Sequence, residues 1–135
     1  MSRRWRNDQG SASVELAILA PLVGLLLGAV VLVGRVQLAR ADVEGAARSA
    51  ARDLSIARDP YVAVDGVRAG LMATLDVGSP TCRSLSFTPD IGSARVSVTL
   101  TCTVDLQEAG VLPVPGSMSV SASASEVIDT YREGP

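Results

Sequence analysis

Several kinds of side chain are absent or scarce in this 135-residue chain, and each shortage excludes a class of function. Histidine is absent and all twelve basic residues are arginine, so the side chains that most often act as bases near neutral pH are missing. One Trp, two Tyr and one Phe are too few for a base-stacking surface or an aromatic-lined ligand pocket. The net charge of −2 lacks the concentrated positive field that phosphate binding requires. We therefore expect no enzyme activity, no nucleic-acid partner and no small-molecule substrate.

Only two cysteines are present, Cys82 and Cys102. Without histidine they have neither the ligand number and spacing of a zinc site nor a partner for nucleophilic catalysis. We therefore expect no metal and no cofactor. The simplest use of the pair is a disulfide in an oxidising compartment, and the alternative is two buried free thiols.

Apolar sequence is what the chain has in excess. Apolar residues make up 47% of it and charged residues 19%, and the mean hydropathy of +0.32 is unusual for a wholly soluble domain. The stretch from Leu16 to Gly34 carries no charge, and as a helix rising ~1.5 Å per residue it spans roughly 28 Å, the thickness of a bilayer core. We expect residues 11–34 to form a transmembrane helix.

The flanks of this span bear on its orientation. Arg3, Arg4 and Arg6 precede it, as is typical of a cytoplasmic flank, but as many arginines follow it between residues 35 and 49. The oxidising compartment expected for the cysteines favours a cytoplasmic N-terminus and an extracytoplasmic C-terminal part.

Helical patterning continues beyond the span. Apolar residues between 36 and 57 recur at spacings of three, four and seven, with arginines on another face, which indicates an amphipathic helix. We expect one helix over residues 13–58, with Ser13 as its N-cap and with Glu44 and Arg48 paired on its surface. The Asp59-Pro60 step ends it, and a second helix is expected over residues 62–75.

Beyond residue 80 the apolar period changes to two. Between residues 95 and 106 every even position is apolar or Cys and every odd position is polar or charged, which predicts a half-buried strand. Residues 82–88 and 118–124 alternate in the same way, and residues 110–116 are expected to form a loop. The chain is therefore predicted to be α+β, with a helical region over residues 35–80 and a small antiparallel β domain over residues 81–135.

A hairpin is expected to bring the two cysteines together. A turn at residues 89–93 pairs Leu85 with Val98 and places Cys82 near Cys102. Strict alternation, however, puts the Cys82 side chain on the opposite face of the strand from Leu85. A β-bulge would remove this conflict, and so would a position of Cys82 just before the strand.

An acidic residue stands at the start of the apolar span. The segment reads Gly10-Ser11-Ala12-Ser13-Val14-Glu15 and continues directly into the apolar run. An acid at the boundary of a membrane helix is costly. Two explanations remain open: a favourable interaction with the positive end of the helix dipole, or a positively charged partner.

These residues resemble the processing site of type IV pilins, in which a prepilin peptidase cuts after a glycine that ends a short basic leader. With Pro21 after LAILA, then GLLLG and the later AARSAARDLSIA, residues 10–58 are similar to TadE-like proteins, the minor pseudopilins of tight-adherence (Flp-type) pili. The C-terminal SASASEVIDTYRE is also similar to the end of such proteins. Leu16 departs from the pattern, since Flp-type sequences usually carry an aromatic residue there.

The resemblance implies a pilin-like fold and specific roles for three residues. Gly10 would end a cleaved leader of residues 1–10, Ser11 would be the new N-terminus, and Glu15 would pair with the Ser11 amine of a neighbouring subunit. The implied partners are a prepilin peptidase, other pilins or pseudopilins, the pilus assembly platform and the membrane.

Small residues recur every four positions along the span, at Ala20, Gly24 and Gly28. Such a stripe lets helices approach closely in a membrane or a filament, although small residues are also common in apolar spans generally.

Two other functions remain open. The chain could be an unprocessed single-pass anchor for a small extracytoplasmic binding domain, or a secreted protein cut after Ala41, where Ala39-Arg40-Ala41 matches a signal-peptidase site. The mature N-terminus distinguishes the three readings, at Ser11, Met1 or Asp42.

Overall fold

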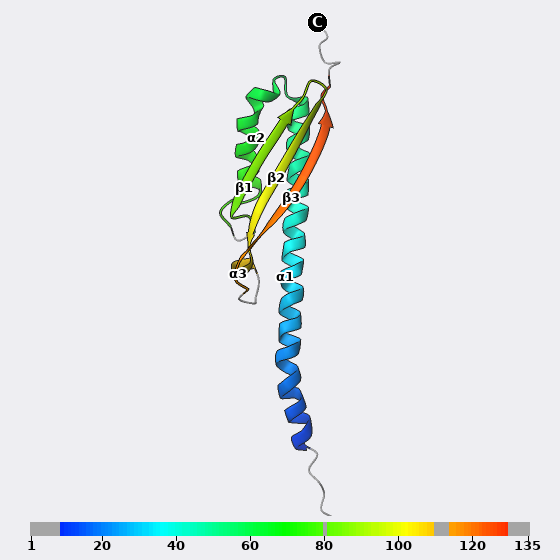
Figure 1. Ribbon diagram of the computed structural model, residues 1–135, viewed down its shortest axis with the longest axis vertical. Coiled ribbons are helices and arrows are strands. Elements are labelled where there is room, and N and C mark those ends of the chain that lie inside the picture. Colours follow the sequence, from blue (N-terminus) through cyan, green and yellow to red (C-terminus); the bar gives the residue numbers. More distant parts are fainter. Residues whose placement is uncertain (1–8, 80, 110–113, 130–135) are drawn as a thin grey trace, which may run out of the picture.

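The chain folds into one long helix that carries a small α+β unit along its C-terminal half (Figure 1). The computed structural model describes residues 9–79, 81–109 and 114–129. In chain order the elements are α1 (Gln9–Ile56), α2 (Pro60–Thr74), β1 (Ser84–Ile91), β2 (Arg95–Asp105), α3 (Leu106–Ala109) and β3 (Ser117–Val127). The predicted α+β class, with a long helix, a short second helix and a small antiparallel sheet, is confirmed.

Helix α1 is continuous over 48 residues, with Pro21 inside it, and measures roughly 72 Å at ~1.5 Å per residue. It begins earlier than the sequence predicts, so the assignment of Ser13 as N-cap is wrong. Ser13 lies inside the helix, where its hydroxyl donates to the Gly10 carbonyl at 3.1 Å. The helix ends at Ile56, two residues before the expected end at Arg58.

The second half of α1 is amphipathic, as predicted. Glu44 and Arg48 form an ion pair at 3.9 Å on its exposed face. The opposite face is rich in alanine, whose small side chain lets the sheet approach the helix closely. The buried residues of this face are Ala39, Val43, Ala46, Ala47, Ala50, Ala51 and Leu54.

Helix α2 starts at Asp59-Pro60, which was expected only to end the preceding helix. Asp59 is its N-cap, and the Asp59 Oδ1 accepts hydrogen bonds from the backbone N–H groups of Tyr61 at 3.0 Å and Val62 at 3.4 Å. Pro60 occupies the first turn, where its missing N–H costs no hydrogen bond. The helix packs beside α1 and also contacts β1.

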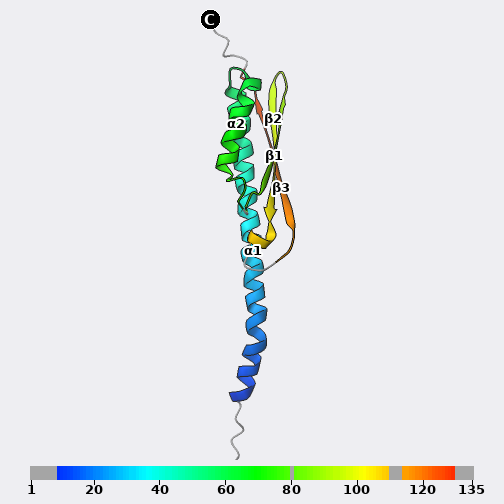
Figure 2. The same ribbon diagram turned by 90° about the vertical axis from the view of Figure 1, so that its left-hand side faces the viewer.

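The three strands form an antiparallel sheet in the order β1-β2-β3. Helix α1 lies against one face and contacts β2 and β3, as the side view in Figure 2 shows. The even positions of β2 point into this layer and are buried, and the odd positions are polar. The buried set is Val96, Val98, Leu100, Cys102 and Val104.

The predicted hairpin register is wrong by four residues. Leu85 lies opposite Cys102, not Val98. The cause is the position of the turn: β1 continues through Pro89 to Ile91, and the Gly92 N–H donates to the Arg95 carbonyl at 2.9 Å. Proline is tolerated in β1 because this is an edge strand.

The short helix α3 was not predicted. Asp105 begins it, since its Oδ1 accepts hydrogen bonds from the backbone N–H groups of Gln107 at 3.0 Å and Glu108 at 3.4 Å. The other carboxylate oxygen of Asp105 pairs with Arg83. The expected loop over residues 110–116 falls partly outside the described residues, and residues 114–116 have no regular secondary structure.

Candidate functional site

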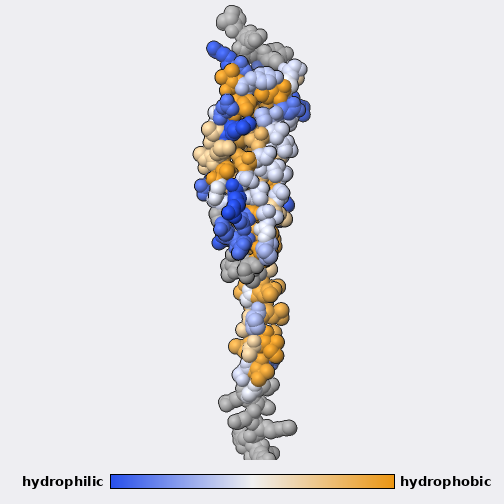
Figure 3. Space-filling view, turned by 60° about the vertical axis from the view of Figure 1, so that its left-hand side comes forward, coloured by the Kyte–Doolittle hydropathy of each residue, from blue (hydrophilic) through white to orange (hydrophobic). Residues whose placement is uncertain are grey.

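The first half of α1 projects beyond the sheet and exposes a continuous apolar surface, coloured orange along the lower stalk in Figure 3. Side chains such as Leu16 at 70% and Leu22 at 63% are largely exposed. Of the described helices, only α1 is long and apolar enough to cross a membrane, and only 6% of its most apolar stretch is buried. A helix of this composition in the core of a soluble protein would be covered, so the exposure fits a lipid-facing segment.

The residues of the predicted cleavage site lie at the start of this helix. Gly10 and Ser11 are in its first turn, and nothing lies within 4 Å of a Cβ built on Gly10. The local structure here rests on helical backbone hydrogen bonds and the Ser13 contact to Gly10. Helix ends fray readily, and the bond between Gly10 and Ser11 lies in the turn of α1 that opens most easily.

Glu15 lies beyond the first turn of α1, which contains no acidic residue. The favourable effect of the helix dipole falls off within the first turn, so this effect is a weak explanation for an acid at that place. Glu15 is exposed, and it forms no ion pair within the part of the chain that the structure describes. Its carboxylate is therefore available to a partner outside the chain.

The three residues of the small-residue stripe differ in their exposure. Ala20 and Gly24 are exposed, and nothing lies within 4 Å of a Cβ built on Gly24. Gly28 is buried. The open part of the stripe therefore lies in the first half of the apolar segment, on the same helix as Glu15 and close to it in sequence.

The two cysteines form a disulfide, with their Cα atoms 5.4 Å apart. Both are buried, at 2% exposure for Cys82 and 0% for Cys102. Cys82 lies just before β1, outside the strand. No bulge is therefore needed to explain why its side chain does not follow the alternation of β1. The bond ties the segment after α2 to the central strand.

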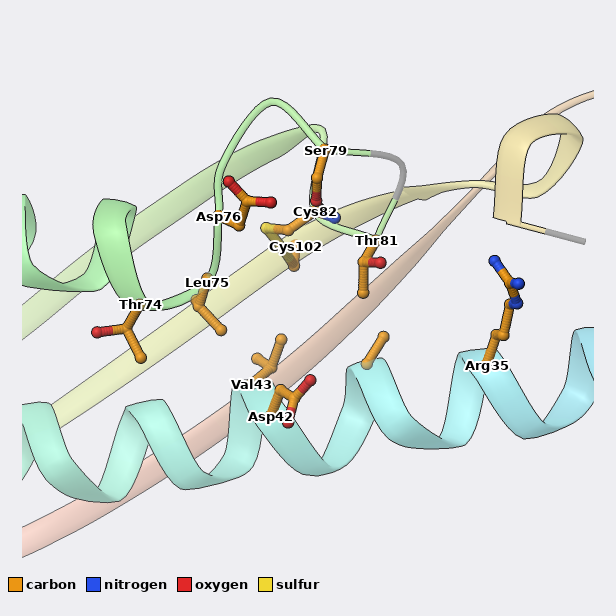
Figure 4. A pocket seen from close by; sticks show the side chains of 11 residues that line it. Arg35, Asp42, Val43, Thr74, Leu75, Asp76, Ser79, Thr81, Cys82 and Cys102 are labelled. Carbon is orange, nitrogen blue, oxygen red and sulfur yellow. Dashed lines mark hydrogen bonds between the residues drawn. A yellow bond between two sulfur atoms is a disulfide. The ribbon is translucent and has the colours of Figure 1, made fainter.

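A cavity of about 430 Å³ lies beside the disulfide, between α1 and the segment that follows α2 (Figure 4). Arg35 lines one end of it, and Asp42 and Asp76 contribute carboxylates. No group of three or more metal-ligating side chains occurs in the described ranges. No local sequence pattern indicates this cavity, because its walls come from segments far apart in the chain.

Comparison with known families gives one result. Residues 10–52 match a family described as TadE-like protein. The match begins at Gly10 and covers most of α1, including Glu15, the small-residue stripe and most of the alanine-rich face. Neither the comparison with curated proteins nor the comparison with solved structures found a match.

Proposed function

We propose that this chain, whose N-terminal region is TadE-like, is a minor pseudopilin of a tight-adherence type IV pilus. The family is associated with pilus structure and assembly, not with enzyme activity. Helix α1 anchors the chain in the membrane through residues 11–34. Residues 35–80 and the β domain of residues 81–135 lie on the extracytoplasmic side, where the disulfide persists.

One observation carries this proposal. The matched segment joins an accessible Gly10, a Glu15 that has no ion pair among the described residues, and an exposed apolar helix, in that order. A plain membrane anchor needs only the last of these. The first two support cleavage after Gly10 by a prepilin peptidase, followed by assembly with other pilins or pseudopilins through the Ser11 amine and the Glu15 carboxylate.

The test is the N-terminal sequence of the chain extracted from membranes. We expect Ser11 as the first residue of the wild type. Gly10→Val should leave the leader uncut, because a branched side chain blocks close approach of the peptidase to the backbone, while insertion through Leu16 to Gly34 continues. The matched control is Ala12→Val, which adds bulk two residues away and should still be cut.

Other outcomes separate the alternatives. A wild-type chain that starts at Met1 would identify an unprocessed anchor, and one that starts at Asp42 would identify a secreted protein. Cleavage of Gly10→Val at the same bond as the wild type would show that the glycine is not read by the peptidase.

A further inference from the structure

Among the residues that the structure describes, strand β3 forms a free edge of the sheet. It is 11 residues long and pairs only with β2. Within the described part of the chain, no hydrogen bond outside the sheet reaches the backbone of its residues. An edge strand of this kind carries a row of unpaired N–H and C=O groups, which is a template for another strand.

The register identifies which residues present these groups. The Gly92 bond to Arg95 starts the ladder, and antiparallel pairs then alternate between bonded and non-bonded. Ser97 is thus bonded to β1, and its pair with Ser125 on β3 is a non-bonded one. The N–H and C=O of Ser125 therefore point to the free edge. The same holds for every second residue of β3, namely Ser117, Ser119, Ser121 and Ser123.

Side-chain contacts agree with this assignment. Side chains come closest in non-bonded pairs, and hydroxyl contacts join these pairs across β2 and β3. The distances are 3.1 Å for Ser97–Ser125, 3.3 Å for Thr99–Ser123 and 3.0 Å for Thr101–Ser121. The outward-facing residues of the edge are thus small and uncharged, and several are already fixed in place by neighbouring hydroxyls.

The opposite edge of the sheet is protected. Pro89 in β1 lies in a non-bonded pair with Val98 by the same alternation, so the N–H that it lacks is one that would face outward. Asp90 adds a charge next to it. Proline and charge are common protections of natural edge strands. Strand β3 has no proline and no charge before Glu126, so within the described ranges one edge is protected and the other is open.

We propose that β3 accepts an extended strand from a different protein chain, which adds to the sheet along the serine edge. Small side chains let that strand approach the backbone without a steric obstacle. The added strand would place a small or apolar residue against Met118, whose side chain is 42% exposed. It would place a basic residue near Glu126, the only charge on β3.

A second copy of this chain fits the edge less well. Addition to β1 of a neighbour is hindered by Pro89 and Asp90. Two copies held in one membrane by α1, as the proposed function has them, would present their β3 strands in the same direction. A symmetric pair would then be parallel, and parallel pairing is slightly less stable per residue than antiparallel pairing. Cleavage after Gly10 plays no part in this inference.

The experiment is photo-crosslinking of the full-length chain in the membranes of cells that make it. A benzoylphenylalanine at position 119 reports on the edge, because Ser119 points its backbone outward and has no hydroxyl contact to β2. We expect a crosslink to a peptide of another protein, identified by mass spectrometry. The N-terminal sequence of the mature chain is determined on the same preparation. It tests the pseudopilin proposal independently of the crosslink, so failure of one can be told from failure of the other.

Variants distinguish the edge from the face of the sheet. Ser123→Pro removes one outward N–H and breaks no backbone hydrogen bond of the sheet, losing only the hydroxyl contact to Thr99, so it should abolish the crosslink. Ser123→Lys places a charge at the edge and should weaken the crosslink. The matched control is Thr99→Lys, which puts the same charge on the same face but on the central strand, and it should retain the crosslink. Intact disulfide and thermal unfolding confirm that each variant is folded.

Three results would overturn the inference. The first is a crosslink to this chain itself, which would identify a second copy as the occupant. The second is no crosslink at all in the wild type. The third is equal loss in Ser123→Lys and Thr99→Lys, with no loss in Ser123→Pro, which would place the contact on the face of the sheet.

Discussion

The hydroxyl of Tyr61 donates a hydrogen bond to the carbonyl of Ile91 at 3.3 Å, which joins the first turn of α2 to the end of β1. A second contact lies further along the helix, where the Arg68 guanidinium is 5.6 Å from the centre of the Phe87 ring. Only Leu71 of α2 is fully buried. Ala63, Val64 and Val67 are partly buried against the same core, so the position of α2 depends on this packing together with its N-cap and its contacts to β1.

The N-cap gives the first prediction. Asp59→Ala removes the acceptor of two backbone N–H groups and should lower the free energy of unfolding by ~1 kcal/mol, the usual cost of losing a cap. The control is Asp65→Ala, which removes an exposed carboxylate from the same helix and should change stability by less than about 0.5 kcal/mol. Denaturant unfolding of both variants in detergent measures the difference. Equal effects would mean that charge, not capping, is responsible.

The disulfide gives the second. Joining residues 20 apart in sequence restricts the unfolded chain and should contribute ~3 kcal/mol. The double variant Cys82→Ala, Cys102→Ala should lose about that much stability in the same unfolding measurement. Thiol labelling of unreduced, denatured wild-type protein should modify neither cysteine. Labelling of both would show that the bond does not form in the cell and would weaken the extracytoplasmic assignment.

The central strand gives the third. Leu100 is 0% exposed, so Leu100→Ala should destabilise the fold by roughly 2–5 kcal/mol through lost burial and a residual cavity. Thr99→Ala changes the neighbouring residue on the exposed face and should cost no more than about 1 kcal/mol, mainly its contact to Ser123. A similar loss in both variants would contradict the assignment of the two faces of β2.

Sequence patterns predicted the elements better than the contacts between them. The period of two in β2 and the alanine-rich face of α1 each follow from one local rule, and the structure has both. The hairpin register failed because Pro89 and Asp90 are typical turn residues, yet here they protect an edge strand. That role depends on which strand lies outermost, and the order of strands is a tertiary property.

Two further features show the same limit. The sequence does contain a pattern that indicates helix α3, since Asp105 precedes the helix-favouring sequence Leu-Gln-Glu-Ala. Leu106 also fits the alternation of β2, however, and this favoured a longer strand instead. The cavity beside the disulfide had no local signal at all. Within the candidate site, the order of Gly10, Glu15 and the apolar span was visible in the sequence. The absence of an ion pair to Glu15 in the described residues required the fold.

Glu15 gives the last prediction, which separates a pilus role from a simple anchor. If the carboxylate is only a boundary acid, Glu15→Ala should be neutral or should slightly improve insertion, because a charge near the apolar core is costly. In the proposed role it neutralises the Ser11 amine of a neighbour, and its removal leaves that amine unpaired, at a cost of roughly 3–5 kcal/mol for a broken buried pair.

We therefore expect Glu15→Ala to reach wild-type levels in the membrane and to be cut after Gly10, yet to be lost from assembled pili. Glu15→Gln should fail in the same way, because it keeps the size of the side chain but not its charge. Glu44→Ala is the matched control: it removes an exposed acid of the same helix that pairs with Arg48 at the surface, where an ion pair contributes at most about 1 kcal/mol. The measurement is the amount of each variant that co-purifies with pilus components at equal membrane levels. Normal incorporation of Glu15→Ala would remove the assembly role of this residue and leave the family match as the main support for the pseudopilin proposal.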